Sequence, residues 1–289
     1  MNNEELNIIN YTLYIIHYTL YIIHYTLYIM FGLLGKSLGH SFSKDYFTKK
    51  FSMLNLNHIY QNIELDNIAD IIPFVKEHKN LKGFNVTVPY KEEIIPFLDE
   101  IDDTAKEVGA VNTVKIYEDG RLKGFNTDVI GFEELLKKPP RHQVTKSPSV
   151  NEALILGSGG ASKAVQYVLR KENIPFRIAS RGFVLGVRSE ELGVRSEELG
   201  VSYGEINSTG FSPYSIIINT TPVGMFPNVN ECLELPYSTI EARHVFIDLI
   251  YNPEETLFLN KARLKGASTF NGMTMLYEQA EESWRIWNS

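Results

Sequence analysis

The chain has 289 residues, 44% of them hydrophobic, which is enough for one large or two ordinary domains with full cores. Its formal net charge of −7 argues against nucleic acid or an anionic membrane as a partner, so an anionic ligand would have to be met by local positive groups. The single cysteine, Cys232, excludes an internal disulfide and fits a reducing compartment, and we therefore expect a cytoplasmic protein.

The N-terminal stretch is dominated by a seven-residue repeat, which reads NYTLYII, HYTLYII and HYTLYIM between residues 10 and 30. No charged residue occurs from Leu6 to Gly35, a length that could cross a bilayer. The repeat is nevertheless crowded with Tyr, Thr and His, and it lacks the basic start and small-residue cleavage site of a signal peptide. A membrane-associated segment is therefore the second interpretation of this stretch.

A second seven-residue repeat, GVRSEEL, occupies residues 186–192 and again residues 193–199. Two unrelated sequences that share one period are most simply explained by duplication in the coding DNA, without selection for a structure. We therefore expect residues 1–29 to be a repetitive extension that is not native structure, with the native start at Met30. We expect residues 186–199 to be an insertion into a surface connection, where insertions are tolerated.

From Met30 onward the hydrophobic pattern alternates between strand-like and helix-like stretches. The helix expected after the first strand has Phe47 and Phe51 on one stripe, and Pro89 suits the first position of a later helix. A hairpin is expected around residues 118–120. The strands predicted in this half cover residues 30–35, 58–65, 81–88, 111–117 and 121–125, and the predicted helices cover residues 43–54, 68–77, 90–98 and 128–138.

The stretch from Ala153 to Arg181 has the organisation of half a dinucleotide-binding fold. A short buried strand is followed at once by a glycine-rich turn, a helical run and a second strand. In such a unit the first glycine permits the tight turn, and the next lets the backbone approach a pyrophosphate at the helix N-terminus. A tight turn without a ligand is the alternative. The turn residues are Gly157, Ser158, Gly159, Gly160 and Ala161.

The end of the second strand in this unit indicates which nucleotide would bind. A chain that binds NAD places an Asp or Glu there to hold the ribose 2′-hydroxyl, but here the sequence reads Ser180-Arg181-Gly182, with no carboxylate. A guanidinium pairs with a 2′-phosphate through charge-assisted hydrogen bonds. Ser180 and Arg181 therefore favour NADP(H) as the cofactor, and a surface arginine without a ligand is the alternative.

The remaining pattern continues the alternation of strands and helices. Further strands are expected at residues 215–219 and 244–250, and a closing helix is expected at residues 271–287. A polar, proline-bearing loop at residues 139–150 precedes the dinucleotide unit. Strands that alternate with helices imply mostly parallel sheets and therefore an α/β fold.

Four polar clusters precede the dinucleotide unit, each at the predicted end of a strand or helix. They are GHSFSK at 39–44, NVTVPYK at 85–91, GAVNT at 109–113 and GFNTD at 124–128. Each has an ordinary structural explanation, since Ser43 and Asp128 could cap helices and Asn112 could belong to a turn. Together they supply hydroxyls, an ammonium, an amide and a carboxylate, a set that suits a polyhydroxylated acid.

Lys91 and Asp128 are a candidate pair for proton transfer. A lysine in the first turn of a helix has its charged form disfavoured by the helix dipole, which moves it towards use as a general acid or base. An adjacent carboxylate would orient the lysine and restore part of that charge.

At these residues the chain resembles shikimate dehydrogenases, the NADP enzymes of aromatic amino-acid biosynthesis, from about Met30 to Trp287 apart from the repeats. NVTVPYK resembles the family motif NVTxPxK, which implies that Lys91 is catalytic and that Thr87 touches the substrate. GFNTD implies that Asp128 is the partner of the lysine. The other substrate contacts implied by the resemblance are Ser41 and Ser43, which would bind a carboxylate, together with Asn112, Tyr251 and Gln279.

The resemblance extends to the cofactor side. NTTPVGM resembles the family's motif near the nicotinamide end, and it contributes Thr220, Thr221, Gly224 and Met225. The sequence departs from the family at Ser180-Arg181-Gly182, where Asn-Arg-Thr is usual, and at Lys44, where a proline is usual.

The architecture implied by the resemblance is two α/β domains with a cleft between them. A substrate-binding catalytic domain with a mostly parallel sheet would comprise residues 30–130 plus 266–289, and a Rossmann-like NADP-binding domain would comprise residues 131–265 with the insertion at 186–199. The implied reaction is the NADPH-dependent, reversible reduction of 3-dehydroshikimate to shikimate in chorismate biosynthesis, by a monomer or homodimer without a metal.

Besides an enzyme that the repeats have damaged, two alternatives to this function remain. The first is a quinate/shikimate dehydrogenase that prefers NAD, against which Arg181 argues. The second is a non-catalytic nucleotide-binding regulator, which would not need to keep both Lys91 and Asp128 because a sensor requires no proton relay.

Overall fold

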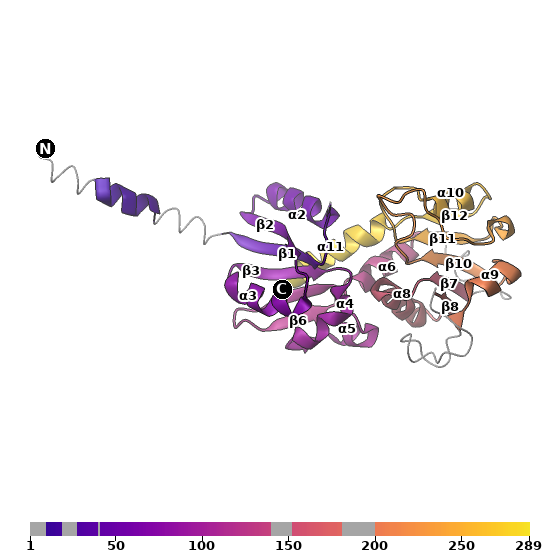
Figure 1. Cartoon of the computed structure of the whole chain (residues 1–289), viewed down its shortest axis with the longest axis horizontal. Helices are drawn as coiled ribbons and strands as arrows, with labels where there is room; N and C mark the ends of the chain where they lie inside the picture. The colour runs from indigo at the N-terminus through magenta and orange to yellow at the C-terminus, as the bar shows by residue number, and fades with distance from the viewer. Residues whose placement is uncertain (1–9, 19–27, 40, 140–151, 181–199) are drawn as a thin grey trace, which may run out of the picture. The chain divides into compact units, whose positions relative to one another are not determined.

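The computed structural model describes residues 10–18, 28–39, 41–139, 152–180 and 200–289 (Figure 1). These residues divide into two compact units: Met1–Glu100 with Thr113–Lys123, and Ile101–Asn112 with Gly124–Ser289. In this division, which rests on contacts between residues, the closing helix belongs to the second unit. The sequence analysis divided the chain by the expected role of each part and assigned residues 266–289 to the substrate domain. The division by role stays a prediction.

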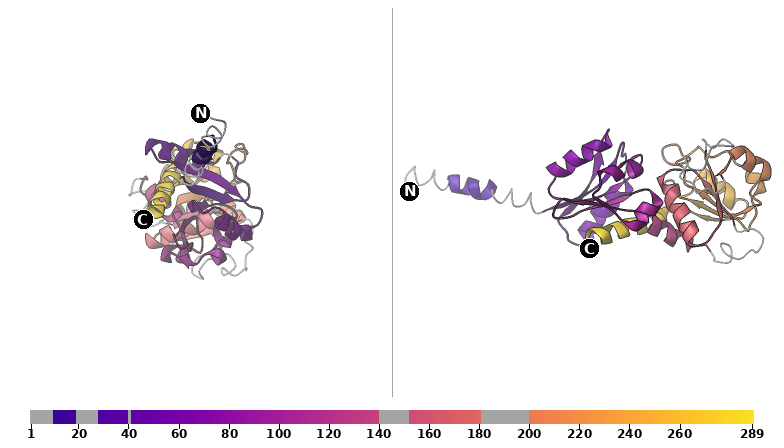
Figure 2. Two further views of the ribbon diagram at one scale, coloured as in Figure 1. Left: turned by 90° about the vertical axis from the view of Figure 1, so that its left-hand side faces the viewer. Right: turned by 90° about the horizontal axis from the view of Figure 1, so that it is seen from below.

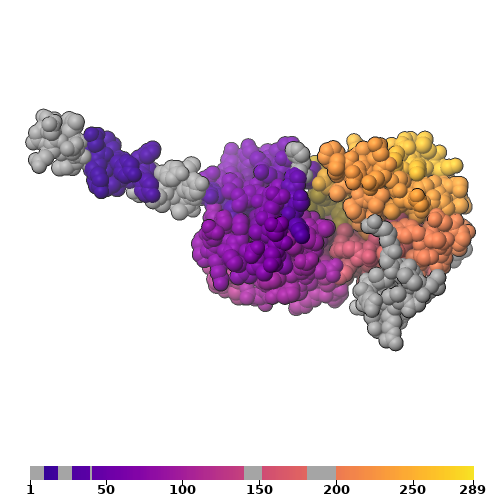
Figure 3. Space-filling model, in the orientation of Figure 1, coloured from indigo at the N-terminus to yellow at the C-terminus, as the bar shows by residue number. Residues whose placement is uncertain are grey.

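Only part of the N-terminal extension lies within the described residues. Residues 10–18 are helical and their side chains are exposed (Figure 3). Among the described helices, none is both long enough and apolar enough to span a bilayer. Arg181 and the second repeat, residues 186–199, lie outside the described residues.

We expect a chain that starts at Met30 to keep the stability and activity of the full chain. The reason is that Met30 is already buried in the first strand, where its backbone N–H donates to the carbonyl of Asn80 at 2.9 Å. Thermal unfolding and turnover of the two chains, measured side by side, test this expectation. Loss of soluble protein from the shortened chain would show that the extension packs against the body.

The first unit is built on a mixed six-stranded sheet in the order β2-β1-β3-β5-β6-β4. Strand β1 runs parallel to both β2 and β3, and β3 pairs with β5 in antiparallel orientation. The strands are β1 Ile29–Gly35, β2 His58–Glu64, β3 Leu81–Val86, β4 Glu100–Ile101, β5 Thr113–Ile116 and β6 Leu122–Phe125. The short helices of this part are α2 Phe42–Met53, η1 Ile68–Asp70, α3 Ile71–Glu77, α4 Tyr90–Glu93 and η2 Ile95–Phe97.

The helix predicted at residues 90–98 is wrong in its length. The structure has α4 over Tyr90–Glu93 and a separate 3-10 turn, η2, over Ile95–Phe97. Pro96 explains the break, because a proline inside a helix has no N–H to donate and its ring clashes with the carbonyl four residues earlier.

The second unit is built on a six-stranded sheet in the order β12-β11-β10-β7-β8-β9, in which every strand pair is parallel. The strands are β7 Glu152–Leu156, β8 Phe176–Ala179, β9 Gly200–Val201, β10 Tyr214–Asn219, β11 Val245–Asp248 and β12 Ser268–Phe270. The helices are α5 Asp103–Val108, α6 Asp128–Leu136, α8 Gly160–Lys171, α9 Tyr203–Thr209, η4 Tyr237–Thr239, α10 Leu257–Arg263 and α11 Met273–Trp287. The predicted α/β fold is confirmed.

Helices cover both faces of the parallel sheet (Figures 1 and 2). On β7, Ile155 packs with α6, α8 and α11 in one buried cluster, whereas Leu154 and Leu156 pack with α9 and α10 in another. Alternate residues of one strand thus reach opposite cores, which is why β7 is apolar at every position from Ala153 to Leu156.

Helices α6 and α11 pack at very short distance where they cross. A Cβ atom added to Gly131 on α6 would overlap with the carbonyl oxygen of Met275 on α11. A glycine is therefore required at this position for the two helices to approach so closely.

Candidate functional site

The predicted serine pair lies at the start of α2, in the first unit. Ser41 is the N-cap, and its Oγ accepts a hydrogen bond from the backbone N–H of Lys44 at 3.3 Å. The alternative that Ser43 caps this helix is therefore wrong. Ser43 lies two residues further on, in the first turn of the helix, is buried, and forms a side-chain hydrogen bond with Tyr60.

Tyr60 continues this contact into the sheet. Its hydroxyl donates to Oδ1 of Asn85 at 2.8 Å, and Nδ2 of Asn85 donates to Oγ1 of Thr113 at 3.0 Å. Burial raises the pKa of Tyr60, so the phenol stays protonated and remains a donor. The chain Ser43–Tyr60–Asn85–Thr113 thus fixes the first motif against β3 and β5.

Thr87 and Lys91 follow the carboxyl end of β3. The backbone N–H of Thr87 donates to the carbonyl of Leu34 at 2.9 Å, which holds this residue beside β1. Lys91 is half-buried in α4, a helix of only four residues. So short a helix has few aligned peptide units, and the helix dipole that we expected to act on Lys91 is correspondingly small.

In the second unit, the structure brings three of the sequence motifs together through Thr127. Oδ1 of Asn112 accepts from the backbone N–H of Thr127 at 2.7 Å and from its hydroxyl at 3.2 Å. The same hydroxyl lies 3.5 Å from Oε1 of Gln279 and 3.3 Å from Oγ of Ser283 on α11. Asn112 and Gln279 are therefore joined by a residue that the sequence analysis did not select.

Asp128 is the first residue of α6 and is buried. The alternative that it caps this helix is wrong, because the N-cap position is Thr127. The turn before it is held by Asn126, whose Nδ2 donates to the carbonyl of Ala110 at 2.8 Å and whose Oδ1 accepts from the N–H of Val129 at 3.3 Å. A carboxylate in the first turn is favoured by the helix dipole. Lys91 and Asp128 belong to different units, and their pairing stays a prediction.

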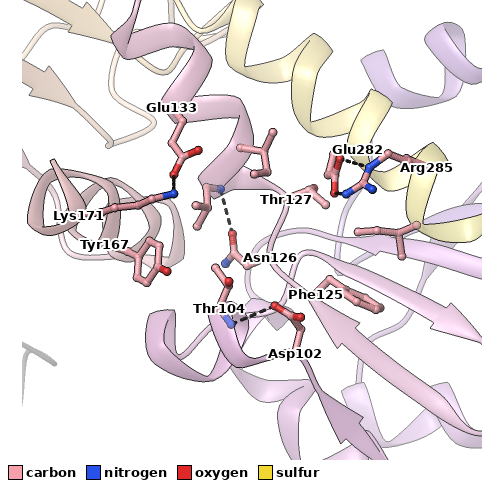
Figure 4. A pocket seen from close by; sticks show the side chains of 13 residues that line it. Asp102, Thr104, Phe125, Asn126, Thr127, Glu133, Tyr167, Lys171, Glu282 and Arg285 are labelled. Atoms are coloured by element: carbon pink, nitrogen blue, oxygen red, sulfur yellow. Dashed lines mark hydrogen bonds and ion pairs between the residues drawn. The ribbon is translucent and has the colours of Figure 1, made fainter. Parts of the chain in front are cut away.

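A hollow of about 220 Å³ borders the turn that leads to Asp128. Figure 4 shows that its charged side chains are paired: Glu133 with Lys171 at 2.6 Å, and Glu282 with Arg285 at 2.5 Å. Asp102 accepts from the backbone N–H of Thr104 at 3.0 Å. The first of these contacts joins α6 to α8, whereas the other two lie within α11 and at the start of α5, and we assign no ligand to the hollow.

The glycine turn has the geometry expected of a nucleotide site. Gly157 has a φ of 114°, and a Cβ added to it would lie 2.6 Å from Oγ1 of Thr220. By contrast, nothing lies within 4 Å of a Cβ added to Gly159, the N-cap of α8. The backbone at the start of α8 is therefore open to a ligand, and its N–H groups suit a pyrophosphate.

The strand order places this turn where ligands bind in open α/β sheets. The chain runs from β7 outward to β8 on one side, while β10 pairs with β7 on the other. Gly157 and Thr220 follow the carboxyl ends of these two neighbouring strands, at the point where the strand order reverses. The hydroxyl of Thr220 donates to the carbonyl of Leu156 at 2.8 Å and joins the two ends.

Five further predicted residues lie on loops of the second unit, and a sixth lies outside the described residues. Tyr251 follows β11 and is half-buried, and burial raises its pKa. Thr221, Gly224 and Met225 follow β10. Ser180 follows β8, whereas Arg181 is outside the described residues. Within the described part of the chain, no group of three or more His, Cys, Asp or Glu side chains could hold a metal ion.

Comparison with known proteins gives matches that extend over both units. Residues 33–114 match the family model for the shikimate dehydrogenase substrate binding domain. The chain is 38% identical over 266 residues to the NADP(+) shikimate dehydrogenase of Methanococcus vannielii, which covers 89% of this chain and 90% of the relative. The chain belongs to the shikimate dehydrogenase family.

Two solved structures of related enzymes carry ligands. The shikimate 5-dehydrogenase of Thermus thermophilus, in complex with NADP(H) and shikimate, is 30% identical, with a TM-score of 0.71 over 90% of this chain and 93% of that one. The quinate dehydrogenase of Corynebacterium glutamicum, in complex with NAD, is 26% identical, with a TM-score of 0.76 over 90% and 93%. The predicted family and the predicted pair of α/β domains are thereby confirmed.

Proposed function

We propose that this member of the shikimate dehydrogenase family interconverts 3-dehydroshikimate and shikimate with NADP(H), as a step of aromatic amino-acid biosynthesis in the cytoplasm. The observation that carries this proposal is the 38% identity over 89% of the chain to an NADP(+) shikimate dehydrogenase. The open glycine turn at the carboxyl edge of the parallel sheet supports it, because such a turn suits a dinucleotide pyrophosphate.

The bound cofactor would supply hydride to the ketone carbon, or accept it from the alcohol carbon in the reverse direction. Lys91 would donate a proton to the carbonyl oxygen during reduction and take it from the hydroxyl during oxidation. The carboxylate of Asp128 would orient the ammonium and stabilise its charged form. Because proton transfer balances the change at oxygen, this pair completes the chemistry without a metal ion.

The remaining site residues would bind and orient the substrate. The hydroxyls of Ser41 and Ser43 would hold its carboxylate, and Thr87 would contact the ring substituents. The cluster of Asn112, Thr127 and Gln279 supports a role in binding hydroxyl groups. Oδ1 of Asn112 accepts two hydrogen bonds from Thr127, which fixes the orientation of the amide that would contact a substrate oxygen.

The function is tested by mixing purified protein with NADP and shikimate and following the near-ultraviolet absorbance of NADPH. The second candidate function is that of a quinate dehydrogenase that uses NAD, which is favoured by the similarity to a quinate dehydrogenase in complex with NAD. Parallel reactions therefore replace shikimate by quinate and NADP by NAD. Turnover with quinate and NAD alone would replace the proposed function by the second candidate. Cofactor binding without any turnover would favour a regulator.

Arg181 should select the cofactor. We expect Arg181→Ala to weaken the binding of NADP far more than that of NAD, because only NADP carries the 2′-phosphate that a guanidinium can bind through two hydrogen bonds. Steady-state KM values for both cofactors measure the effect, and Arg177→Ala is a control on the preceding strand, where Arg177 pairs with Glu152 at 2.9 Å. An equal loss for both cofactors in Arg181→Ala would mean that this arginine is structural.

A further inference from the structure

We propose that Asp248 is a positioning residue that holds the two loops of the second unit through which cofactor and substrate would be contacted. This inference rests on the proposed function and adds a residue that touches neither ligand. Through its contact with Asn219, Asp248 orients the loop after β10. Through its contacts with Ile250 and Thr256, it fixes the loop after β11.

Asp248 is the last residue of β11 and has no exposed surface. In the parallel register it lies opposite Asn219, the last residue of β10. Its Oδ1 accepts from Nδ2 of Asn219 at 3.0 Å and from the backbone N–H of Ile250 at 3.1 Å. Its Oδ2 accepts from the hydroxyl of Thr256 at 2.6 Å. One carboxylate thus receives donors from three segments at the carboxyl edge of the sheet.

A buried carboxylate is costly unless its environment compensates for the lost hydration. Among the described residues Asp248 has no ion-pair partner, and burial raises its pKa to about 6 despite the three hydrogen bonds, which favour the charged form. An apolar side chain would fill this space at lower cost. The free-energy cost of burying this carboxylate is explained if its two oxygens are needed to hold Asn219, Ile250 and Thr256 in place.

The first arm leads to the loop expected at the nicotinamide end. Because Nδ2 of Asn219 is held by Asp248, its Oδ1 faces Thr221, from which it accepts the backbone N–H at 3.0 Å and the hydroxyl at 2.7 Å. Oγ1 of Thr221 in turn accepts from the N–H of Val223 at 3.3 Å. Asp248 therefore sets which way the Asn219 amide points, and this orientation sets the start of the loop.

The second arm leads to Tyr251. Asp248 binds the N–H of Ile250 on one side of this residue and the hydroxyl of Thr256 on the other. Thr256 is also the N-cap of α10, where its Oγ1 accepts from the N–H of Leu259 at 3.4 Å. The carbonyl of Ile250 accepts from the N–H of Gly272 at 3.0 Å, immediately before α11. Both ends of the Tyr251 loop are therefore fixed by one side chain.

The hydrogen bonds predict different outcomes for two replacements. In Asp248→Asn the amide oxygen can keep the donors of Asn219 and Ile250, and the hydroxyl of Thr256 can rotate to accept from the new NH₂ group. Asp248→Ala leaves all three donors without a partner. We expect Asp248→Ala to raise both the KM and the Kd for NADP by about ten- to a hundredfold, the usual effect of losing a hydrogen bond to a charged group, whereas Asp248→Asn stays within about threefold of wild type.

The matched control is His244→Leu. His244 also has no exposed surface and lies just before β11, at the opposite end of the same strand. We expect this variant to lower the melting temperature while leaving the KM and Kd for NADP unchanged. Equal loss of stability in Asp248→Ala and His244→Leu, with unchanged KM and Kd in both, would overturn the inference because it would show a purely structural role.

Single-arm variants decide the case in which Asp248→Ala does not fold. Thr256→Val removes one donor from the Tyr251 loop, and we expect it to raise the KM for shikimate more than the KM for NADP, with recovery in Thr256→Ser. Equal changes in both constants, or no recovery in Thr256→Ser, would contradict the inference. The Kd for NADP is measured by calorimetry without turnover, so it separates the inference on Asp248 from the proposed function. A wild-type protein that binds NADP but does not convert shikimate would contradict the proposed function and not the role of Asp248.

Discussion

Replacing Lys91 by alanine is expected to lower kcat by about 10²–10⁴-fold, the usual contribution of a general acid or base, while shikimate still binds. The expectation follows from the proposed pairing of Lys91 with the buried carboxylate of Asp128 at the start of α6. Stopped-time assays at saturating shikimate and NADP measure kcat, and calorimetric titration measures the binding of shikimate to the variant.

The role of Lys91 is separated from a general effect of charge by Lys76→Ala, which removes an exposed lysine from α3 in the same unit. This control should leave kcat unchanged. A kcat for Lys91→Ala within about threefold of wild type would contradict proton transfer by this residue. A large loss of shikimate binding with little change in kcat would indicate a role in binding instead.

Replacing Gly131 by alanine should be the most destabilising single methyl addition in the α6–α11 contact. The new Cβ would overlap with the backbone carbonyl of Met275, which cannot rotate away as a flexible side chain could. Overpacking of a core typically costs about 1–3 kcal/mol, which lowers the melting temperature by about 2–4 °C per kcal/mol in a domain of this size. Because α6 begins with Asp128 and α11 carries Gln279, the helix shift should also reduce turnover.

Gly204→Ala is the matched control for this substitution. Gly204 lies in α9, and the nearest atom to an added Cβ is Oγ of Ser202 at 3.8 Å. Alanine is favoured over glycine in helices by about 1 kcal/mol, so this variant should be as stable as wild type or slightly more stable. Calorimetric melting of both variants makes the comparison, and an unchanged melting temperature for Gly131→Ala would mean that the two helices separate without cost.

Much of the fold follows from local sequence signals. The buried strands of the parallel sheet are short runs of apolar residues that follow turn signals. Gly157 indicates the turn after β7, because no other residue adopts its φ of 114° easily. The helix predicted at residues 90–98 is too long because the prediction took Pro89 as a helix start but did not take Pro96 as a helix break. Helix α5 escaped prediction, although Asp102 caps its start and Gly109, with a φ of 70°, ends it.

The candidate site could be predicted only as separate motifs. Ser41, Asn112 and Asp128 are each visible in the sequence, but the bond that brings α11 to the other motifs, from Thr127 to Gln279, joins residues 152 positions apart. Periodicity contains no information on such pairs, because they depend on how α6 meets α11. Asp248 was missed because a single acidic residue at the end of a strand has no local pattern. Nothing in the sequence distinguishes the centre of a hydrogen-bond network from an ordinary turn residue.

The contact between α6 and α11 also constrains when the site can form during synthesis. Thr127 and Ser283 are separated by 156 residues, so ribosomes working at about 5–20 residues per second need on the order of ten seconds to connect them. During that time the side chains of Val129 and Phe132 on α6, which are buried in the finished protein, lack part of their packing. A nascent chain that already has its glycine turn therefore still presents an apolar helix face, and it is at this stage that chaperones or proteases would find it.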